Sequence, residues 1–444
     1  MNRLATQQRK LAYLMAIIIL LIPIIYLGAP SDGRENGFGG KLAQMRNEYE
    51  LGETSLGNVD PASSTMNLVL LGMRGIAVSG LWYQAVQQKD QKDWANLRTT
   101  VDSIVMLQPH FRQVWEFQGW NLAYNVSAEW DGVSDRYYWV KEGAKFLMRG
   151  TKRNHRYPEL PWEVGRIMGA KVGRADEWKQ FRQFFLDDPN LVEGGVDPEI
   201  NPEGKDNYLV AKDWFTIANE MEAKPGISQS RLMPEIFRGY PVRSQLDYAG
   251  VLNREGIFDE VSREAWSTAR TEMTQDWGQE RYMTPAGLIQ LEANDEVLKE
   301  LSEIEGNIYP LDQKQRWVLL RQNVTNYRYW RTRAEVEGSP EMTEAHRLLY
   351  LGRRQFLDEQ DPYTASETLY KGLALMEGVI TNYSELASED NLVEECIKSI
   401  VLWSESLKSQ GKQVPAEYPL REIFDNNPVQ AQETINRFQR FFGG

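Results

Sequence analysis

The chain has 444 residues, more than one compact core usually supports, so we expect either several cores or one array of stacked units. Its net charge of −13, from 50 Lys and Arg against 63 Asp and Glu, would repel phosphate backbones and disfavours nucleic-acid binding. The three histidines (His110, His155, His346) lie far apart, which disfavours a metal site. Cys396 is the single cysteine, so no internal disulfide can form.

A strongly apolar segment lies near the N-terminus. Residues 11–28 read LAYLMAIIILLIPIIYLG and carry no charge over 18 positions, nearly enough helix to cross the hydrocarbon core of a bilayer. Arg3, Arg9 and Lys10 precede the segment, and this basic bias favours an N-terminus in the cytoplasm. Residues 1–28 are therefore predicted to be an uncleaved transmembrane anchor, with the rest of the chain on the opposite side of the membrane.

Two other interpretations of this region remain open. A cleaved signal peptide would need small residues at both cleavage positions, and of Leu27 and Ala29 only the second is small. Residues 66–86, whose only charge is Arg74, would return the following domain to the cytoplasm if they also crossed the membrane. We expect them to form a buried helix instead, because an arginine is costly in lipid and their glycines suit close packing in a core.

The remainder of the chain is predicted to be all-α. Residues 29–62 are rich in Gly, Pro, Asn, Asp and Ser and are typical of a linker, with one short helix expected near 41–49. Beyond them, apolar residues recur at spacings of three and four, and alternating strand patterns are nearly absent. The first helices are expected at 65–88, 93–107, 111–128, 134–150 and 160–186. The predicted organisation is a repeat region (63–188), an irregular helical middle region with long loops (189–310) and a helical C-terminal region (311–444).

Later in the chain the signals differ in strength. Residues 187–206 are an acidic, irregular excursion, and shorter helices are expected around Trp214, Leu246 and Trp266, interrupted by MPEIFRGYP at 233–241. Helix starts are predicted at the cap-and-proline pairs Ser339-Pro340 and Asp361-Pro362. Two antiparallel helices sharing a seam are predicted from two apolar stripes: Leu369, Leu373, Met376, Ile380 and Tyr383 in 363–383, and Val393, Cys396, Ile400, Trp403 and Leu407 in 389–409.

An internal repeat is visible in the first half of the chain. Residues 114–131 read VWEFQGWNLAYNVSAEWD and residues 161–178 read PWEVGRIMGAKVGRADEW, with several identities 47 positions apart. A helical hairpin cannot bury its apolar face alone, so copies stack, with large residues as wedges and small ones where backbones approach. We therefore predict Trp115 and Trp162 to be the packing wedges and Ala123 and Ala170 to be the points of close approach.

The spacing of these residues resembles that of tetratricopeptide (TPR) repeats. Pro109 precedes Trp115 by six positions, and the turn at Gly173-Arg174 follows Trp162 by eleven, as in that family. Departures are the larger period, against about 34 for the family, and Arg166 and Trp178 at positions where TPR units carry small residues.

Over residues 65–270 the chain looks like a group of bacterial membrane-anchored TPR-like proteins of unassigned biochemical role. The resemblance implies an α-solenoid of stacked antiparallel helix pairs, anchored in the inner membrane and facing the periplasm. It transfers no catalytic residues.

No motif for a phosphate loop, a nucleophile elbow, a metalloprotease site or an EF-hand is present, and no cofactor is predicted. Glu116 and Glu163 follow the two tryptophans and could be imagined as a glycosidase-like pair. Equivalent positions in stacked hairpins usually lie farther apart than such a pair requires, so we favour a structural role for both. Aromatic residues at helical spacing are likewise interpreted mainly as packing residues.

Two groups are the predicted partner-binding residues. Tyr137, Tyr138 and Trp139 are consecutive and cannot all face one core, so at least one should meet a groove or a partner. Arg328 and Arg331 belong to the basic, aromatic helix expected at 316–333, which could bind an anionic partner, although internal ion pairs are the favoured use of its arginines.

The predicted function is a non-enzymatic envelope scaffold that binds a protein or peptide, with no nucleic acid and no metal. The alternatives are a glycan-binding or glycan-processing envelope protein that uses aromatic grooves and carboxylates, and a cytoplasmic scaffold if residues 66–86 span the membrane.

Overall fold

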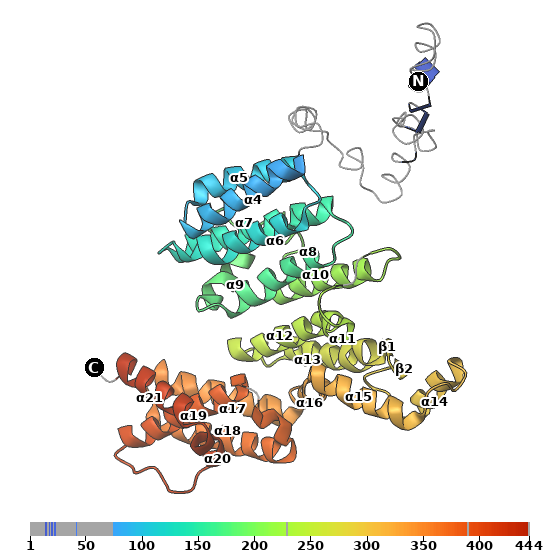
Figure 1. Cartoon of the computed structure of the whole chain (residues 1–444). Coiled ribbons are helices and arrows are strands. Elements are labelled where there is room, and N and C mark those ends of the chain that lie inside the picture. The colour runs from blue at the N-terminus through green and yellow to red at the C-terminus, as the bar shows by residue number, and fades with distance from the viewer. Residues whose placement is uncertain are drawn as a thin grey trace. The chain divides into compact units, whose positions relative to one another are not determined.

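The computed structural model describes residues 74–227, 230–388 and 390–442, together with Leu14, Met15, Ile17, Ile19, Leu20, Ile22, Pro23 and Lys41 (Figure 1). The predicted anchor at 11–28 and linker at 29–62, with its short helix near 41–49, therefore lie largely outside the described residues. So does the first part of the 66–86 segment. Its described part is helical, but only Val78 and Ala85 are buried there, so the prediction of a buried helix is wrong for these residues. Within the described residues, no helix is both long enough and apolar enough to cross a bilayer.

The described part of the chain is all-α apart from one small hairpin, as predicted. Apart from the start of the first helix, which lies outside the described residues, its first helices begin and end close to the expected positions. They are α4 (Arg74–Asp90), α5 (Trp94–Leu107), α6 (Arg112–Trp120), α7 (Val133–Arg153), α8 (Glu159–Arg166) and α9 (Trp178–Leu186). The predicted single helix at 160–186 is wrong, because bend and turn residues at 175–177 separate it into two. Asp93 caps α5 by accepting a hydrogen bond from the Asn96 amide.

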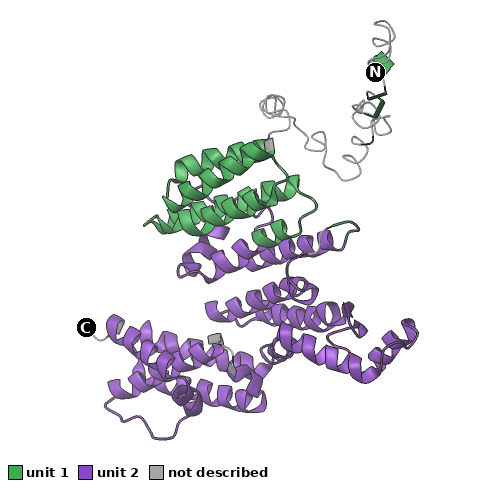
Figure 2. Ribbon diagram, in the orientation of Figure 1, with its two compact units in different colours: residues 1–164, 224–228 green, residues 165–223, 229–444 purple. Residues whose placement is uncertain are grey.

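The chain divides into two compact units, coloured separately in Figure 2. Unit 1 comprises residues 1–164 and 224–228, and unit 2 comprises residues 165–223 and 229–444. The border falls inside α8, and therefore inside the predicted repeat region 63–188 and not at its end.

Helices α6 and α7 of unit 1 pack closely because glycines line their contact. A Cβ atom at Gly143 would lie 2.6 Å from the Gly119 carbonyl oxygen and 2.9 Å from the Ala123 amide nitrogen. A Cβ atom at Gly150 would lie 2.9 Å from the ring of Trp115, which is 2% exposed. Trp115 also donates from Nε1 to the Pro109 carbonyl oxygen at 2.9 Å. Only residues without a side chain let the two backbones approach this far.

A second glycine-lined contact lies at the start of unit 2. Here α10 (Asn207–Glu222) packs on the residues that follow α8. A Cβ atom on Gly165 would lie 2.7 Å from the ring of Phe215. A Cβ atom on Gly173 would lie 2.4 Å from the Tyr208 hydroxyl. That hydroxyl donates to the Gly173 carbonyl oxygen at 2.8 Å. Gly169 lies between these two glycines in the sequence, and a Cβ atom on it would lie 3.4 Å from the Ala211 methyl group.

The internal repeat is present in the structure, but its period is 46 residues and not 47. All nine buried positions of residues 114–127 recur 46 positions later in residues 160–173. A π-helical turn also recurs at this spacing, at Asn121–Val126 and Ile167–Val172. Such turns are rare inside α-helices, so their recurrence marks the two segments as copies of one structural element.

This one-residue difference changes the roles predicted for the second copy. At a spacing of 46, Trp162 corresponds to Glu116 and is likewise half-buried. Ala170 corresponds to Tyr124, not to Ala123, and it is exposed. The assignment of Ala170 as a point of close approach is therefore wrong. Gly169 has that role, as Ala123 has in the first copy.

The middle region contains helices around Leu246 and Trp266, as expected, a short helix within 233–241, where an interruption was expected, and a hairpin that was not predicted. Its elements are α11 (Pro234–Arg238), α12 (Tyr240–Glu255), α13 (Glu260–Thr271), strands β1 (Tyr282–Thr284) and β2 (Gly287–Ile289), and α14 (Asp295–Ile304). The strands are antiparallel, with Tyr282 opposite Ile289. The fully buried ammonium of Lys314 donates to the Leu288 carbonyl oxygen at 2.8 Å and to Glu305 at 2.5 Å, and so fixes the hairpin to the helices beside it.

The C-terminal helices are α15 (Leu311–Thr325), α16 (Tyr327–Val336), α17 (Pro340–Leu357), α18 (Pro362–Asn382), α19 (Asp390–Ser409), α20 (Arg421–Asn426) and α21 (Pro428–Phe442). The predicted caps are confirmed, since Ser339 and Asp361 accept hydrogen bonds from first-turn amides. The predicted continuous helix 316–333 is wrong, because Asn326 adopts a left-handed φ of 55° and divides it.

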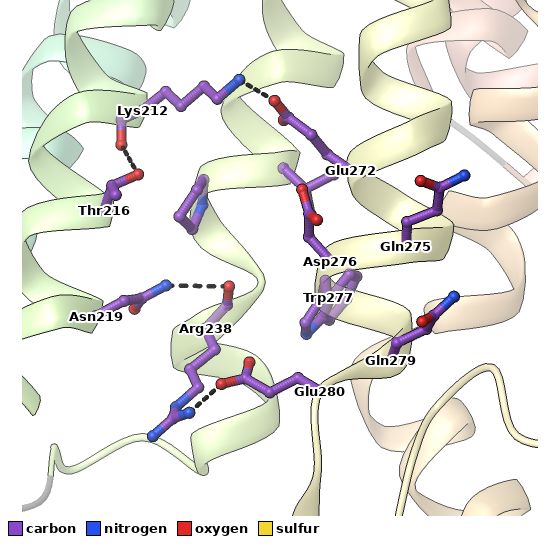
Figure 3. A pocket seen from close by; sticks show the side chains of 12 residues that line it. Lys212, Thr216, Asn219, Arg238, Glu272, Gln275, Asp276, Trp277, Gln279 and Glu280 are labelled. Carbon is purple, nitrogen blue, oxygen red and sulfur yellow. Dashed lines mark hydrogen bonds and ion pairs between the residues drawn. The ribbon is translucent and has the colours of Figure 1, made fainter. Parts of the chain in front are cut away.

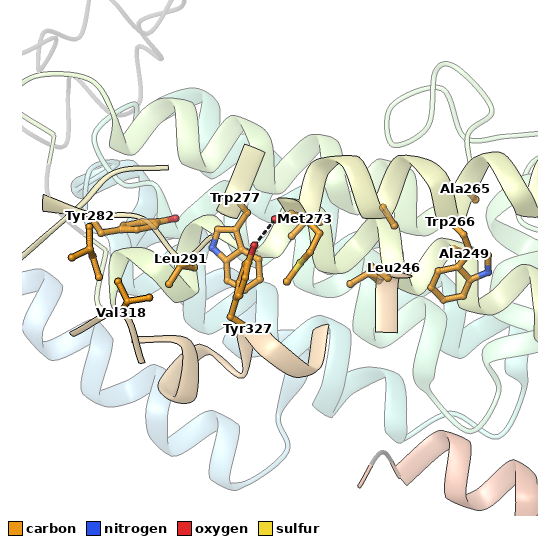
Figure 4. Packing of buried hydrophobic residues seen from close by; sticks show 14 of the residues in the cluster. Leu246, Ala249, Ala265, Trp266, Met273, Trp277, Tyr282, Leu291, Val318 and Tyr327 are labelled. Carbon is orange, nitrogen blue, oxygen red and sulfur yellow. Dashed lines mark hydrogen bonds between the residues drawn. The ribbon is translucent and has the colours of Figure 1, made fainter. Parts of the chain in front are cut away.

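Two apolar cores organise unit 2. One lies between α12, α13 and the helices after the hairpin, where the rings of Trp277 and Tyr327 meet edge to face at 5.2 Å (Figure 4). The other joins α17, α18 and α19. It contains the predicted stripes except two residues. Val393 packs with Ile397 and Ala431 in a separate small cluster, and Tyr383 is 40% exposed at the end of α18.

Candidate functional site

A pocket of about 650 Å³ lies in unit 2 and is a candidate site (Figure 3). Its walls come from α10, from the α11–α12 junction and from the segment that follows α13. Its lining is mainly polar: Lys212, Thr216, Asn219, Arg238, Pro241, Val242, Glu272, Gln275, Asp276, Trp277, Gln279 and Glu280.

The wall after α13 owes its form to a π-helical turn, Glu272–Asp276, followed by a single 3-10 turn, Trp277–Gln279. Met273 and Trp277 face the core and are 0% and 3% exposed, whereas Gln275, Asp276 and Gln279 are exposed. The wider turn thus holds a run of polar side chains at the pocket while the apolar residues stay in the core. Helical irregularities of this kind are frequent at functional sites.

Trp277 is fixed between the pocket and the core. Its Nε1 donates to the Glu235 carbonyl oxygen at 2.9 Å. A Cβ atom at Gly239 would lie 2.5 Å from the Trp277 ring, so this glycine is what allows the ring to lie against the α11–α12 junction. The Arg243 guanidinium lies 5.5 Å from the centre of the same ring. Trp277 therefore forms a well-packed part of the pocket wall.

Two ion pairs connect the walls. Lys212 of α10 pairs with Glu272, and its ammonium also donates to Gln245 at 2.9 Å. Arg238 of α11 pairs with Glu280, and its Nε lies 3.6 Å from the buried Glu222. Figure 3 shows one pair toward each end of the lining, with Asp276 between them.

The pKa of the Glu272 carboxyl group is raised above its ordinary value. Partial burial raises its pKa, and the hydrogen bond and charge of Lys212 oppose this rise without cancelling it. Tyr282 donates to Glu280 at 2.9 Å, and its burial raises its own pKa. Carboxylates and cations at both ends of the pocket thus already bind one another, which makes them suited to holding the walls in place.

The residues predicted from the sequence do not line this pocket. In unit 1, Tyr137 is buried and Tyr138 is 38% exposed. The ring of Trp139 stacks on that of Trp130 at 6.3 Å. The expectation that not all three aromatic residues face the core is confirmed.

The arginines of unit 2 serve mainly in internal ion pairs. Arg331 donates to Glu292 at 2.7 Å and to Glu335 at 3.1 Å, and Arg321 lies 3.0 Å from the buried Glu235. Arg328 is exposed. The favoured interpretation, that these arginines form ion pairs within the protein, is confirmed for Arg321 and Arg331.

The structure also describes Glu116 and Glu163, the carboxylates considered as a glycosidase-like pair. Glu116 lies 3.2 Å from Nε of Arg112, and Nη1 of the same arginine donates to Glu159 at 2.8 Å. Glu116 therefore has a structural partner within unit 1. Glu163 is half-buried.

Sequence reasoning missed the pocket because its residues carry no motif. The only local signal is the polar run Thr274-Gln275-Asp276 directly before the aromatic Trp277. Comparison of the chain with protein-family models, with curated proteins and with solved structures finds no match.

Proposed function

We propose that this chain is a membrane-anchored, TPR-like helical-repeat scaffold that binds an extended segment of a protein partner in the pocket of unit 2, and that it catalyses no reaction. The observation that carries the proposal is the polar lining, in which Thr216 and Asn219 of α10 lie across the pocket from the carboxamides of Gln275 and Gln279 (Figure 3). A carboxamide offers both a donor and an acceptor, as a peptide group does. Such a lining suits the recognition of an extended backbone.

The repeat supports the proposed TPR-like architecture. Buried positions and a π-helical turn recur at one spacing, as expected where equivalent helices each pack against a neighbour. Stacked antiparallel helix pairs of this kind present side chains from several helices to one partner. Here α10, the α11–α12 junction and the segment after α13 all contribute to one pocket.

The first prediction tests the pocket directly. Thr216 is exposed on α10 and lines the pocket, so Thr216→Trp should fill part of it. We expect peptides selected from a random library on the full chain to bind this variant at least about tenfold more weakly, measured by calorimetry.

Ile217→Trp is the matched control for that measurement. Ile217 is the next residue of α10, is 39% exposed and does not line the pocket. It should change the affinity less than about twofold. Failure to select any binding peptide, or equal binding by Thr216→Trp and the unaltered chain, would contradict the proposed function.

The proposed location is the inner membrane of a bacterium, with the bulk of the chain facing the periplasm. Its support is the uncharged segment at 11–28 with the basic residues before it. The second prediction is that a C-terminal epitope tag is digested when protease is added to intact spheroplasts, and that the chain sediments with membranes. A tag protected until the spheroplasts are lysed would place the domain in the cytoplasm instead.

A further inference from the structure

We infer that the pocket of unit 2 accepts a cationic group, an ammonium or guanidinium on a flexible chain, as the side chain of lysine or arginine in a partner segment provides. The inference rests on the proposed function for the origin of that group. The preference for a cation follows from the hydrogen-bond acceptors and charges of the lining that have no partner among the described residues.

Several donors of the lining are already used within the protein. The Thr216 hydroxyl donates to the Lys212 carbonyl oxygen at 2.9 Å, which leaves oxygen lone pairs for a ligand. The Asn219 amide donates to the Arg238 carbonyl oxygen at 3.2 Å, and its Oδ1 accepts no hydrogen bond from any described residue. Within the described part of the chain, the Thr216 hydroxyl therefore remains an acceptor without a donor, whereas the Asn219 oxygen is buried.

The charges of the lining show the same imbalance. Lys212 and Arg238 are each paired with a carboxylate, Glu272 and Glu280 respectively. Asp276 is exposed on the π-helical turn and has no ion-pair partner among the residues that the structure describes. Once the pairs cancel, a negative charge remains in the pocket. An incoming carboxylate or phosphate would be repelled by this charge.

A cation with several N–H groups satisfies both conditions at once. An ammonium carries three donors and a guanidinium five, and neither accepts a hydrogen bond. The Asp276 carboxylate would supply the charge, and the oxygens of Thr216, Gln275 and Gln279 would supply further acceptors. Pro241 and Val242 add apolar surface for the methylene groups of a lysine or arginine side chain.

The third prediction measures this preference with capped tripeptides, Gly-X-Gly, in which X is lysine, arginine, norleucine or glutamate, and with spermidine as a free amine. Binding to the full chain is followed by saturation-transfer NMR. We expect the lysine and arginine peptides to bind and the glutamate peptide not to bind. Asp276→Asn, which keeps the shape and removes the charge, should weaken the cationic peptides about tenfold or more.

Glu300→Gln is the matched control, because it also exchanges an exposed carboxylate of unit 2 for an amide but lies outside the pocket on α14. It should leave binding within about twofold. Equal binding of the norleucine and lysine peptides, or an unchanged affinity in Asp276→Asn, would overturn the inference and leave the proposed peptide binding intact. Binding of spermidine without any peptide would support the cationic site and contradict the proposed function.

Discussion

Gly143→Ala should lower the free energy of unfolding by about 2 kcal/mol, although alanine is the better helix former by about 1 kcal/mol. The new Cβ atom would lie 2.6 Å from the carbonyl oxygen of Gly119 and 2.9 Å from the amide nitrogen of Ala123. Both are backbone atoms, which cannot turn aside as a flexible side chain can. The helices α6 and α7 must therefore separate, and the packing of Trp115 and its neighbours is loosened with them.

The control is Gly80→Ala, in the exposed part of α4, where a Cβ atom would meet nothing within 4 Å. This change should raise the free energy of unfolding, by at most about 1 kcal/mol. Both variants can be compared with the unaltered chain by urea unfolding followed by far-UV circular dichroism. If the two variants were equally stable, the close contact at Gly143 would not exist as described.

His346→Leu should cost about 3–5 kcal/mol of stability at neutral or mildly acidic pH, because it removes a buried cation from two carboxylates. The imidazole Nε2 lies 2.8 Å from Glu337 and Nδ1 lies 3.0 Å from Glu395, and the ring is 5% exposed. These contacts join α17 to the end of α16 and to α19. Arg333, 4.0 Å from Glu337, supplies the second positive charge.

The same contacts predict a pH dependence with a definite sign. Burial disfavours the charged imidazole, but Glu395 and Glu337 outweigh burial and hold the pKa of His346 well above its ordinary value. A raised folded-state pKa gives stability that is complete below about pH 6.5 and is lost as the pH rises through the folded value. The difference in unfolding free energy between the unaltered chain and His346→Gln should therefore shrink from pH 6 to alkaline pH.

His155→Gln is the control, since His155 is exposed in unit 1. It should leave the pH dependence of unfolding unchanged. A difference between His346→Gln and the unaltered chain that stays constant from pH 6 to alkaline pH would mean that the buried imidazole is neutral.

Helix starts were predictable because their causes are local. Ser339 and Asp361 precede prolines and bond to amides two or three residues later, so the short sequence contains the whole interaction. The break at Asn326 was missed even though Val324, Thr325 and Tyr327 beside it are weak helix formers. A left-handed residue there is set by how α15 and α16 pack on the α12–α13 core.

The pocket could not be predicted for a related reason. Its lining comes from residues 212–219, 238–242 and 272–280, which are distant in sequence and meet only when α10, α12 and the π-helical turn pack together. No single segment has a composition that distinguishes it from an ordinary amphipathic helix. The predicted partner-binding residues, in contrast, were chosen for local aromatic or basic density, which does not determine where a cavity forms.

By itself, the sequence determined that the described chain is helical, where most helices begin, and that one element recurs in its first half. The tertiary structure alone decided the register of that recurrence. Identities such as Trp115 and Trp162 suggest 47 residues, whereas burial and the π-helical turns repeat at 46. One residue turns a side chain by about 100° around a helix, so matching letters can lie on different faces. Which face is buried depends on the neighbouring helix, and that neighbour is fixed only by packing.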